Sequence, residues 1–276
     1  MTTLYSSIIQ LRVLRDGCLP QMQGRLALSA FLDIVAQVDP ALAQALHDAP
    51  SGKPFTVSPL RGLPLPHDGE IHVKAGQAGW LRVTLAGEEL FGVFVRRFLY
   101  GDTQPTIRLG QVELGVSEVL TSPGSHPWAG YTTIDELLAN VQPRDTITLD
   151  IASPTSFSLG DNRVEIMPRP ELIFGTLRKK WEMWCGQELA QPLSREWLRE
   201  YVLVSDWRMQ SRMLRYGPQA QIGSEGQVTF RLFEAEPEAR YLLNVLADFA
   251  FYAGVGRKTT QGMGQVRRIV GMKDEG

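Results

Sequence analysis

Residues 254–264 read Gly-Val-Gly-Arg-Lys-Thr-Thr-Gln-Gly-Met-Gly. Glycine at four of these eleven positions lets the backbone adopt positive φ and lets a ligand approach closely. The four are Gly254, Gly256, Gly262 and Gly264. Arg257 and Lys258 stand between two Gly-apolar-Gly brackets and precede the hydroxyls of Thr259 and Thr260. Backbone N–H groups and two cations suit a phosphodiester chain, so this segment, named here the glycine loop, predicts a nucleic-acid contact.

Three other interpretations of the glycine loop can be weighed against this one. A Walker A loop needs Gly-Lys-Ser/Thr after a strand, whereas here Arg257 precedes Lys258 and a predicted helix precedes the loop. A dinucleotide-binding fingerprint needs a strand before the loop and a helix after it, which is the reverse order. A flexible connector without a ligand stays open, although a connector has no need of glycine brackets around a basic centre.

The chain before the loop divides into two similar series of expected elements. In the first, apolar alternation, as at Leu81, Val83 and Leu85, predicts strands, and apolar residues at helical spacing predict helices. The expected order is strand 4–14, helix 26–38, strand 53–60, strand 81–85, helix 90–99 and strand 112–119. This βαββαβ order is typical of a ferredoxin-like domain.

The same order recurs in the second half, although no sequence repeat is visible. The expected elements are strand 146–151, helix 171–184, strands 201–204 and 227–233, helix 238–252 and strand 263–269. Val141-Gln-Pro-Arg144 separates the two series. The sequence therefore predicts an α+β chain of two tandem ferredoxin-like (RRM-like, βαββαβ) domains, residues 1–142 with the candidate catalytic residues and 143–276 with the glycine loop.

Composition is that of a soluble globular protein. The 276 residues are 43% hydrophobic and 21% charged, with a formal net charge of −2. This net charge does not indicate a polyanion ligand, but nucleic-acid binding depends on where basic residues cluster. The first residues show no signal peptide, and no apolar run reaches the roughly 18 residues of a membrane span. Cys18 and Cys185 form no Cys-x-x-Cys pair. We therefore expect a cytoplasmic protein with no disulfide framework, cysteine-based zinc site or membrane partner.

Four histidines are the candidates for acid–base or metal chemistry. His67 and His72 lie near Asp68 and Glu70, but this spacing matches no established ligand motif, so solvated loop residues are favoured over a metal site. His126 also stands in an expected loop. These residues lead us to expect no metal and no cofactor.

His47 differs because it closes the first helical region and is followed by Lys53, six residues later, across the turn Pro50-Ser-Gly52. Alone, His47 could be a helix C-terminal histidine favoured by the helix dipole. Together, the two side chains can face one space. An imidazole can accept or donate a proton near neutral pH, and an ammonium can stabilise charge on a phosphate. This pair suits RNA cleavage by the substrate's own 2′-OH, which requires no metal.

The glycine loop resembles the signature of the RAMP superfamily of CRISPR-associated RNA-binding proteins. Within it, the chain is most similar to the endoribonucleases that cut CRISPR repeat transcripts into guide RNA. The segments that carry this similarity are 46–48 (Leu-His-Asp), 52–60 (Gly-Lys-Pro-Phe-Thr-Val-Ser-Pro-Leu), 153–157 (Ser-Pro-Thr-Ser-Phe) and 170–175 (Pro-Glu-Leu-Ile-Phe-Gly). The resemblance implies that His47 is a general acid or base and Lys53 a transition-state stabiliser. The implied products carry a 2′,3′-cyclic phosphate and a 5′-OH.

The chain departs from the family pattern at the first helix, where a tyrosine is often the third catalytic residue. Here residues 29–33 read Ser-Ala-Phe-Leu-Asp. Arg25 or Ser29 could take that role, or no residue does. A non-catalytic RNA-binding RAMP subunit of an interference complex therefore stays an alternative, as does a ferredoxin-like interaction module without RNA. As partners we expect CRISPR repeat RNA, with other CRISPR effector subunits and a homodimer left open.

Further basic residues extend the candidate RNA surface. Arg178, Lys179 and Lys180 lie in the helix expected at 171–184, and Arg208, Arg212 and Arg215 would share one face if that stretch were helical. Contact with RNA and a solvated face are both open for these cations. Trp181, Trp184 and Trp207 could stack on bases, but core packing is the favoured interpretation.

Overall fold

The computed structural model describes residues 2–99, 105–187, 189, 193–216 and 219–269. The chain forms two compact units, which we describe separately. The first contains Met1–Thr133, Leu214–Gln221 and Thr260–Gly262, and the second Ile134–Met213, Ile222–Thr259 and Met263–Gly276. Among the described residues, no helix combines the length and apolarity needed to cross a membrane.

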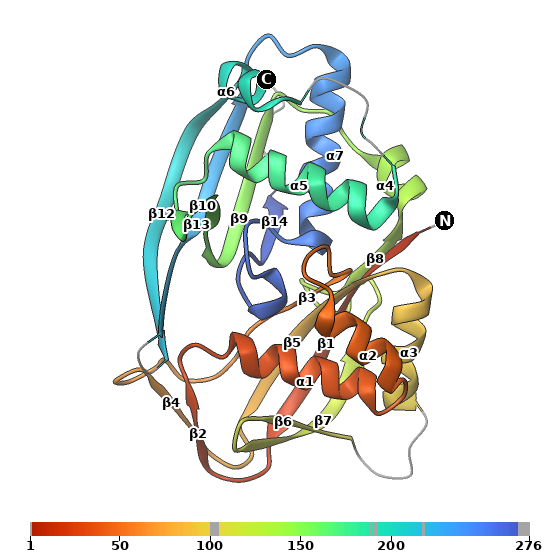
Figure 1. Cartoon of the computed structure of the whole chain (residues 1–276), viewed down its shortest axis with the longest axis vertical. Helices are drawn as coiled ribbons and strands as arrows, with labels where there is room; N and C mark the ends of the chain where they lie inside the picture. Colours follow the sequence, from red (N-terminus) through yellow and green to blue (C-terminus); the bar gives the residue numbers. More distant parts are fainter. Residues whose placement is uncertain (1, 100–104, 188, 190–192, 217–218, 270–276) are drawn as a thin grey trace. The chain divides into compact units, whose positions relative to one another are not determined.

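The first unit is built on an antiparallel sheet (Figure 1). Its strands are β1 (Thr3–Val13), β3 (Phe55–Val57), β5 (Ala78–Ala86), β6 (Thr106–Leu109), β7 (Val112–Leu120) and β8 (Gly130–Thr133). Their order is β3-β5-β1-β7-β6, with β8 also paired to β1. The two central strands, β1 and β5, come from opposite ends of the first βαββ segment, which is the ferredoxin-like arrangement.

Helices α1 (Gly24–Ala36) and α3 (Glu88–Leu99) pack against this sheet and each other. The buried rings of Phe31 and Phe55, 4.4 Å apart, join α1 to β3. Residues 29–33 contain no tyrosine, and the Phe31 ring in this stretch lies in the core.

Helix α2 (Pro40–Asp48) was not anticipated as a separate helix, yet it carries His47. Asp39 begins it, because its carboxylate accepts a hydrogen bond from the Leu42 backbone N–H at 2.9 Å, and Pro40 occupies the first turn. A nine-residue helix offers too few apolar positions for periodicity alone to reveal it.

A two-stranded ribbon of β2 (Gly17–Pro20) and β4 (Glu70–Val73) also belongs to the first unit. Residues 70–73 were expected to be loop. They form a strand because Ile71 and Val73 alternate with Glu70 and His72, with the apolar pair buried and the polar pair exposed.

The second unit repeats the arrangement (Figure 1). Its sheet contains β9 (Thr146–Thr155), β12 (Val202–Tyr216), β13 (Gln219–Leu232) and β14 (Val266–Ile269), in the order β12-β13-β9-β14. Helices α5 (Pro170–Cys185) and α7 (Pro237–Ala253) pack on each other. The prediction of two tandem ferredoxin-like domains is confirmed.

Smaller elements of the second unit surround this frame. They are α4 (Ile134–Asn140), β10 (Phe157–Gly160), β11 (Arg163–Glu165), α6 (Arg195–Tyr201) and the short 3₁₀ helix η1 (Thr259–Gln261), whose last two residues belong to the first unit. Contacts group α4 with the second unit: the Tyr241 hydroxyl on α7 donates to the Leu138 carbonyl at 2.9 Å. The boundary expected between residues 142 and 143 stays a prediction.

The condition under which Arg208, Arg212 and Arg215 would share a helical face is not met, because this stretch is strand β12. The side chain of Arg215 lies outside the described residues. Trp181 and Trp184 are core residues of the second unit, as the packing interpretation favoured, whereas Trp207 on β12 is 42% exposed.

Candidate functional site

The candidate catalytic pair lies at the C-terminal end of α2. The His47 side chain is exposed in the last turn, and Gly52 takes a φ of 70° in the turn that follows. The Lys53 ammonium donates to the backbone carbonyls of Leu46 at 2.5 Å and His47 at 2.8 Å. Lys53 therefore caps the helix that presents His47.

Lys53 is half-buried, and its surroundings act on the ammonium in opposite directions. Desolvation by burial lowers the pKa of Lys53, and the nearby Asp48 carboxylate opposes that shift. A cation at a helix C-terminus is favoured by the unpaired carbonyls there. The geometry thus brings an imidazole and an ammonium to one helix end.

Helix α1 carries Arg25 and Ser29, the two residues considered for a third catalytic role. Arg25 and Ser29 are both exposed on α1, and their spacing of four residues places them on one face. In the same unit, a Cβ added to Gly24 would lie 2.0 Å from the Gln261 carbonyl oxygen, so the start of α1 packs directly on residues 260–262 of the glycine loop. Only glycine fits at position 24.

The glycines of the glycine loop occupy positions that other residues would not tolerate. Positive φ occurs at Gly254 (64°), Gly256 (74°), Lys258 (56°), Gly262 (84°) and Gly264 (72°). A Cβ on Gly256 would lie 2.5 Å from the Ser156 carbonyl oxygen, and one on Gly264 would lie 2.0 Å from the Val255 carbonyl oxygen. Glycine is therefore needed for both conformation and close packing.

Backbone hydrogen bonds fix this shape. The Val255 N–H donates to the Gly264 carbonyl at 2.9 Å, and the Arg257 N–H donates to the Ser156 carbonyl at 2.9 Å. The loop therefore closes on itself and attaches to the segment after β9. These bonds distinguish it from a loose connector, and they hold Arg257 at a defined position.

Lys180 and Thr259 are not placed as predicted. The Lys180 ammonium is buried and donates to the Ala253 carbonyl at 2.7 Å, the Gly254 carbonyl at 3.2 Å and the Thr259 hydroxyl at 3.0 Å. Burial lowers the pKa of Lys180 to about 7. Both side chains stabilise the loop from within, so the interpretation of Lys180 and Thr259 as RNA contacts does not fit their geometry.

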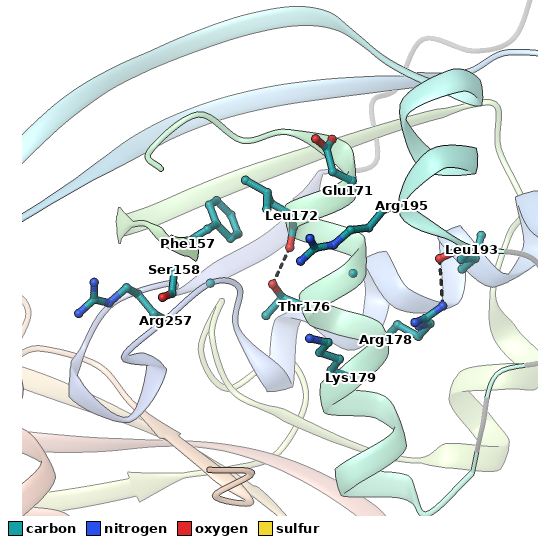
Figure 2. Close-up of a pocket in the computed structure, with 12 residues that line it drawn as sticks. Phe157, Ser158, Glu171, Leu172, Thr176, Arg178, Lys179, Leu193, Arg195 and Arg257 are labelled. Carbon is teal, nitrogen blue, oxygen red and sulfur yellow. Dashed lines mark hydrogen bonds between the residues drawn. The ribbon is translucent and has the colours of Figure 1, made fainter. Parts of the chain in front are cut away.

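A basic pocket of about 270 Å³ opens beside the glycine loop within the second unit (Figure 2). Its cationic lining residues come from α5, α6 and the loop: Arg178, Lys179, Arg195 and Arg257. Figure 2 shows Arg257 beside Ser158 at one end of the pocket, and Arg178 and Leu193 at the other. Phe157 and Gly256 also line it. The pocket brings the predicted residues Arg178, Lys179, Gly256 and Arg257 together.

The charged groups of the pocket are not equally available. The Arg178 guanidinium donates to the Leu193 carbonyl at 3.1 Å. Glu171, which also lines the pocket, accepts from the Arg199 guanidinium at 2.9 Å. That pair neutralises the carboxylate, so the lining favours an anion. Lys179 is exposed and Arg257 half-buried.

Sequence reasoning missed Arg195, because it opens a seven-residue helix that shows no long apolar pattern. Its position after Ser194, which begins α6 by accepting the Trp197 N–H at 3.1 Å, was the available signal. Lys258 is half-buried beside Arg257 and does not line this pocket.

Arg208 and Arg212 lie on strand β12 and form ion pairs with neighbouring acids. The Arg208 Nε lies 3.4 Å from Asp206 Oδ2, and the Arg212 Nε donates to Glu225 Oε1 at 2.6 Å. Both arginine side chains are more than half exposed. Exposed pairs of this kind are weak and exchange partners readily.

One group of described side chains has the composition of a metal site. Cys18, Glu70 and His72 place a ligand atom each within 4.8 Å of one another on the β2–β4 ribbon. From the sequence we expected Glu70 and His72 to be loop residues and Cys18 to be a thiol unrelated to them. Strand pairing brings the three together across more than fifty positions of sequence.

Two family models match most of the chain. A CRISPR Cas6 N-terminal domain matches residues 4–139, and the CRISPR-associated endoribonuclease Cas6 matches residues 149–266. A curated CRISPR-associated endoribonuclease Cas6 from Streptococcus thermophilus is 25% identical over 133 residues, or 48% of this chain and 54% of that protein. The match thus spans about half the length of that curated relative.

Solved structures resemble the chain over nearly its whole length. A Cas6 product complex has a TM-score of 0.80 and 29% sequence identity, covering 96% of this chain and 99% of the other. A Thermus thermophilus Cas6 has a TM-score of 0.74 and 28% identity, covering 98% and 99%.

Proposed function

The chain belongs to the Cas6 family of CRISPR-associated endoribonucleases, and from this premise we propose that it cleaves CRISPR repeat RNA to release guide RNA. A similar solved Cas6 structure is described as a product complex. The observation that carries the proposal is the end of α2, where the exposed His47 imidazole and the Lys53 ammonium share one helix terminus.

The proposed reaction is metal-independent transesterification. The ribose 2′-OH loses its proton and its oxygen attacks the adjacent phosphorus, while the bond to the 5′ oxygen breaks and that oxygen gains a proton. His47 accepts or donates one of these protons. Lys53 stabilises the negative charge that develops on the phosphate oxygens. The products are a 2′,3′-cyclic phosphate and a 5′-OH.

Lys53 can leave its resting contacts to do this. It donates to the Leu46 and His47 carbonyls in the last turn of α2, and the contact with His47 is exposed, so that water can replace the ammonium there. The third catalytic role stays unassigned between Arg25, Ser29 and no residue.

We assign RNA binding to the pocket beside the glycine loop. Arg257, Lys179 and Arg195 supply positive charge to a phosphodiester chain, and Phe157 offers an aromatic ring. Arg178, Arg208, Arg212 and Lys258 are proposed as secondary contacts, which would exchange their present partners for RNA. The glycines at 254, 256, 262 and 264 act by shaping the loop.

A second candidate function is a non-catalytic RNA-binding RAMP subunit, and the observation in its favour is that α1 contains no tyrosine. A homodimer, other CRISPR effector subunits as partners and a cytoplasmic location belong to the proposal as well.

Incubating the full chain with end-labelled repeat RNA in EDTA, followed by denaturing and native gels, tests these alternatives. We expect a discrete cut whose 5′ fragment ends in a cyclic phosphate. A stable complex without cleavage would favour the non-catalytic subunit. Neither binding nor cleavage would leave only an interaction module that does not use RNA.

A further inference from the structure

The β2–β4 ribbon carries a polar cluster that the proposed cleavage does not use. In its register Cys18 lies opposite His72, Leu19 opposite Ile71 and Pro20 opposite Glu70. Because side chains alternate along a strand, Cys18, Glu70 and His72 share one face.

The opposite face of the ribbon fixes that register. Leu19, Ile71 and Val73 are buried in the core of the first unit, with exposed fractions of 1%, 7% and 2%. A slip by one residue would expose Ile71 and Val73 if β4 moved, or Leu19 if β2 moved. The three polar side chains are therefore held together by the fold and not by chance orientation.

We propose that Cys18, Glu70 and His72 form a Zn²⁺ site with three protein ligands and one position open to water. Their ligand atoms lie within 4.8 Å of one another, and the Cys18 Sγ lies 3.2 Å from Glu70 Oε2. Zinc bonds of about 2.0–2.3 Å in a tetrahedron require ligand atoms roughly 3.3–3.7 Å apart. Small side-chain rotations on a fixed backbone close this difference.

The donor set indicates which ion fits. Thiolate and imidazole select zinc and similar first-row transition ions, whereas Mg²⁺ and Ca²⁺ prefer sets made of oxygen. The thiol now donates its hydrogen to the carboxylate at 3.2 Å. On binding, the ion replaces that proton, which leaves to solvent, and the resulting thiolate and the carboxylate offset the ion's charge.

The site would cross-link β2 to β4 in a ribbon of only four residues on each strand. A short two-stranded ribbon is marginally stable alone, and a ligand that binds only the folded state adds stability by mass action. The inference rests on residues outside the proposed cleavage machinery and does not depend on the proposed function.

The test is titration of the metal-free full chain with Co²⁺, which substitutes for zinc and is visible by absorbance. We expect one Co²⁺ per chain, visible bands of a tetrahedral ion, and a near-ultraviolet charge-transfer band from the Cys18 thiolate. Zn²⁺ should displace Co²⁺ and raise the melting temperature by roughly 3 °C or more.

Two variants and one control decide the assignment. Cys18→Ser should abolish the charge-transfer band, and His72→Gln should weaken Co²⁺ binding at least about tenfold. Cys185→Ser, which changes the other cysteine, on α5, should bind as the parent does. Circular dichroism verifies that each variant is folded.

Absence of stoichiometric binding by the parent, or a charge-transfer band that persists in Cys18→Ser, would overturn the inference. If Cys18→Ser failed to fold, loss of Co²⁺ binding in the folded His72→Gln variant would still support the metal site. Repeat-RNA cleavage that continues in EDTA while the Co²⁺ spectrum disappears separates this site from the cleavage chemistry.

Discussion

Two lysines, one in each unit, donate hydrogen bonds to backbone carbonyls at the C-terminal end of a helix, but they differ in burial. The Lys53 ammonium donates to the last carbonyls of α2, and the Lys180 ammonium donates to the Ala253 and Gly254 carbonyls at the end of α7. Lys53 is half-buried beside an exposed histidine. Lys180 is buried at its ammonium and makes a third bond, to the Thr259 hydroxyl.

From this difference we infer that availability, and not charge, decides which of the two lysines can take part in chemistry. If Lys53 turns toward a phosphate, water can solvate the two carbonyls it leaves. If Lys180 turned outward, buried carbonyls would lose their donor, which is costly for a buried polar group. We therefore expect Lys53 to act in chemistry and Lys180 to act only on the shape of the glycine loop.

The largest effect is expected from His47→Ala. Loss of a general acid or base should lower the single-turnover cleavage rate by about 10²- to 10⁴-fold, while RNA affinity stays within a few-fold. His67→Ala, an exposed histidine in the same unit, is the matched control and should cleave as the parent does. Equal rates for His47→Ala and the parent would remove His47 from the mechanism.

A smaller loss is expected from Lys53→Ala, by a factor of roughly ten to a hundred, because one charge-stabilising donor disappears. Lys53→Arg keeps the cation and should recover part of the rate. In contrast, Lys180→Met should lower RNA affinity through the loop and leave the rate at saturating RNA within a few-fold. A rate defect in Lys180→Met as large as in Lys53→Ala would break the distinction between the two lysines.

Exchanging Arg257 and Lys258 together for alanine should weaken repeat-RNA binding and flatten its dependence on salt. Each lost phosphate contact should reduce the slope of log K against log salt by somewhat less than one unit. Arg163→Ala removes a cation of β11 that is 69% exposed and lies 3.6 Å from Asp161, and it should leave the slope unchanged. If the double variant also keeps the parental slope, the loop does not contact the RNA backbone.

The smallest effect concerns stability against pH. Burial lowers the pKa of Lys180 to about 7 from an ordinary value of 10.5. Between these values the unfolded chain binds more protons than the folded chain, so the unfolding free energy rises with pH, by at most about 1.4 kcal/mol per pH unit. Below about pH 7 both states are protonated and this contribution has no slope.

Urea unfolding at pH 7, 8 and 9 measures this rise. Lys180→Met should remove it, whereas Lys179→Met, a change at the exposed neighbour, should keep it. The same slope in Lys180→Met and the parent would show that Lys180 is not the titrating group.

The fold was largely predictable because strands and long helices leave a periodic apolar pattern. The candidate RNA-binding site was less predictable than the fold. Arg178, Lys179 and Lys180 are consecutive on α5, and at 3.6 residues per turn three consecutive residues of a helix cannot all share one face. That spacing already required one of the three to point away from the others, but only packing shows that Lys180 turns inward.

Tertiary pairing explains the remaining errors. Arg208 and Arg212 have helical spacing, yet their stretch pairs with β13 as a long strand, and pairing overrides spacing. The neighbourhood of Cys18 and His72 depends on the register of β2 with β4, which no local pattern encodes. Glycine positions were predictable because positive φ constrains residue type directly.

The central claim is that the nucleophile is the substrate's own 2′-OH and that no metal takes part in cleavage. Its most direct test is a repeat RNA with a single deoxyribose immediately 5′ of the cut, incubated with the full chain in EDTA. The account predicts that cleavage is abolished while binding persists, because one hydroxyl contributes little to the total affinity. Unmodified RNA should be cut equally well with and without EDTA. Cleavage of the deoxy-substituted RNA, or a strict requirement for Mg²⁺, would indicate a metal-activated water as the nucleophile and contradict the roles given to His47 and Lys53.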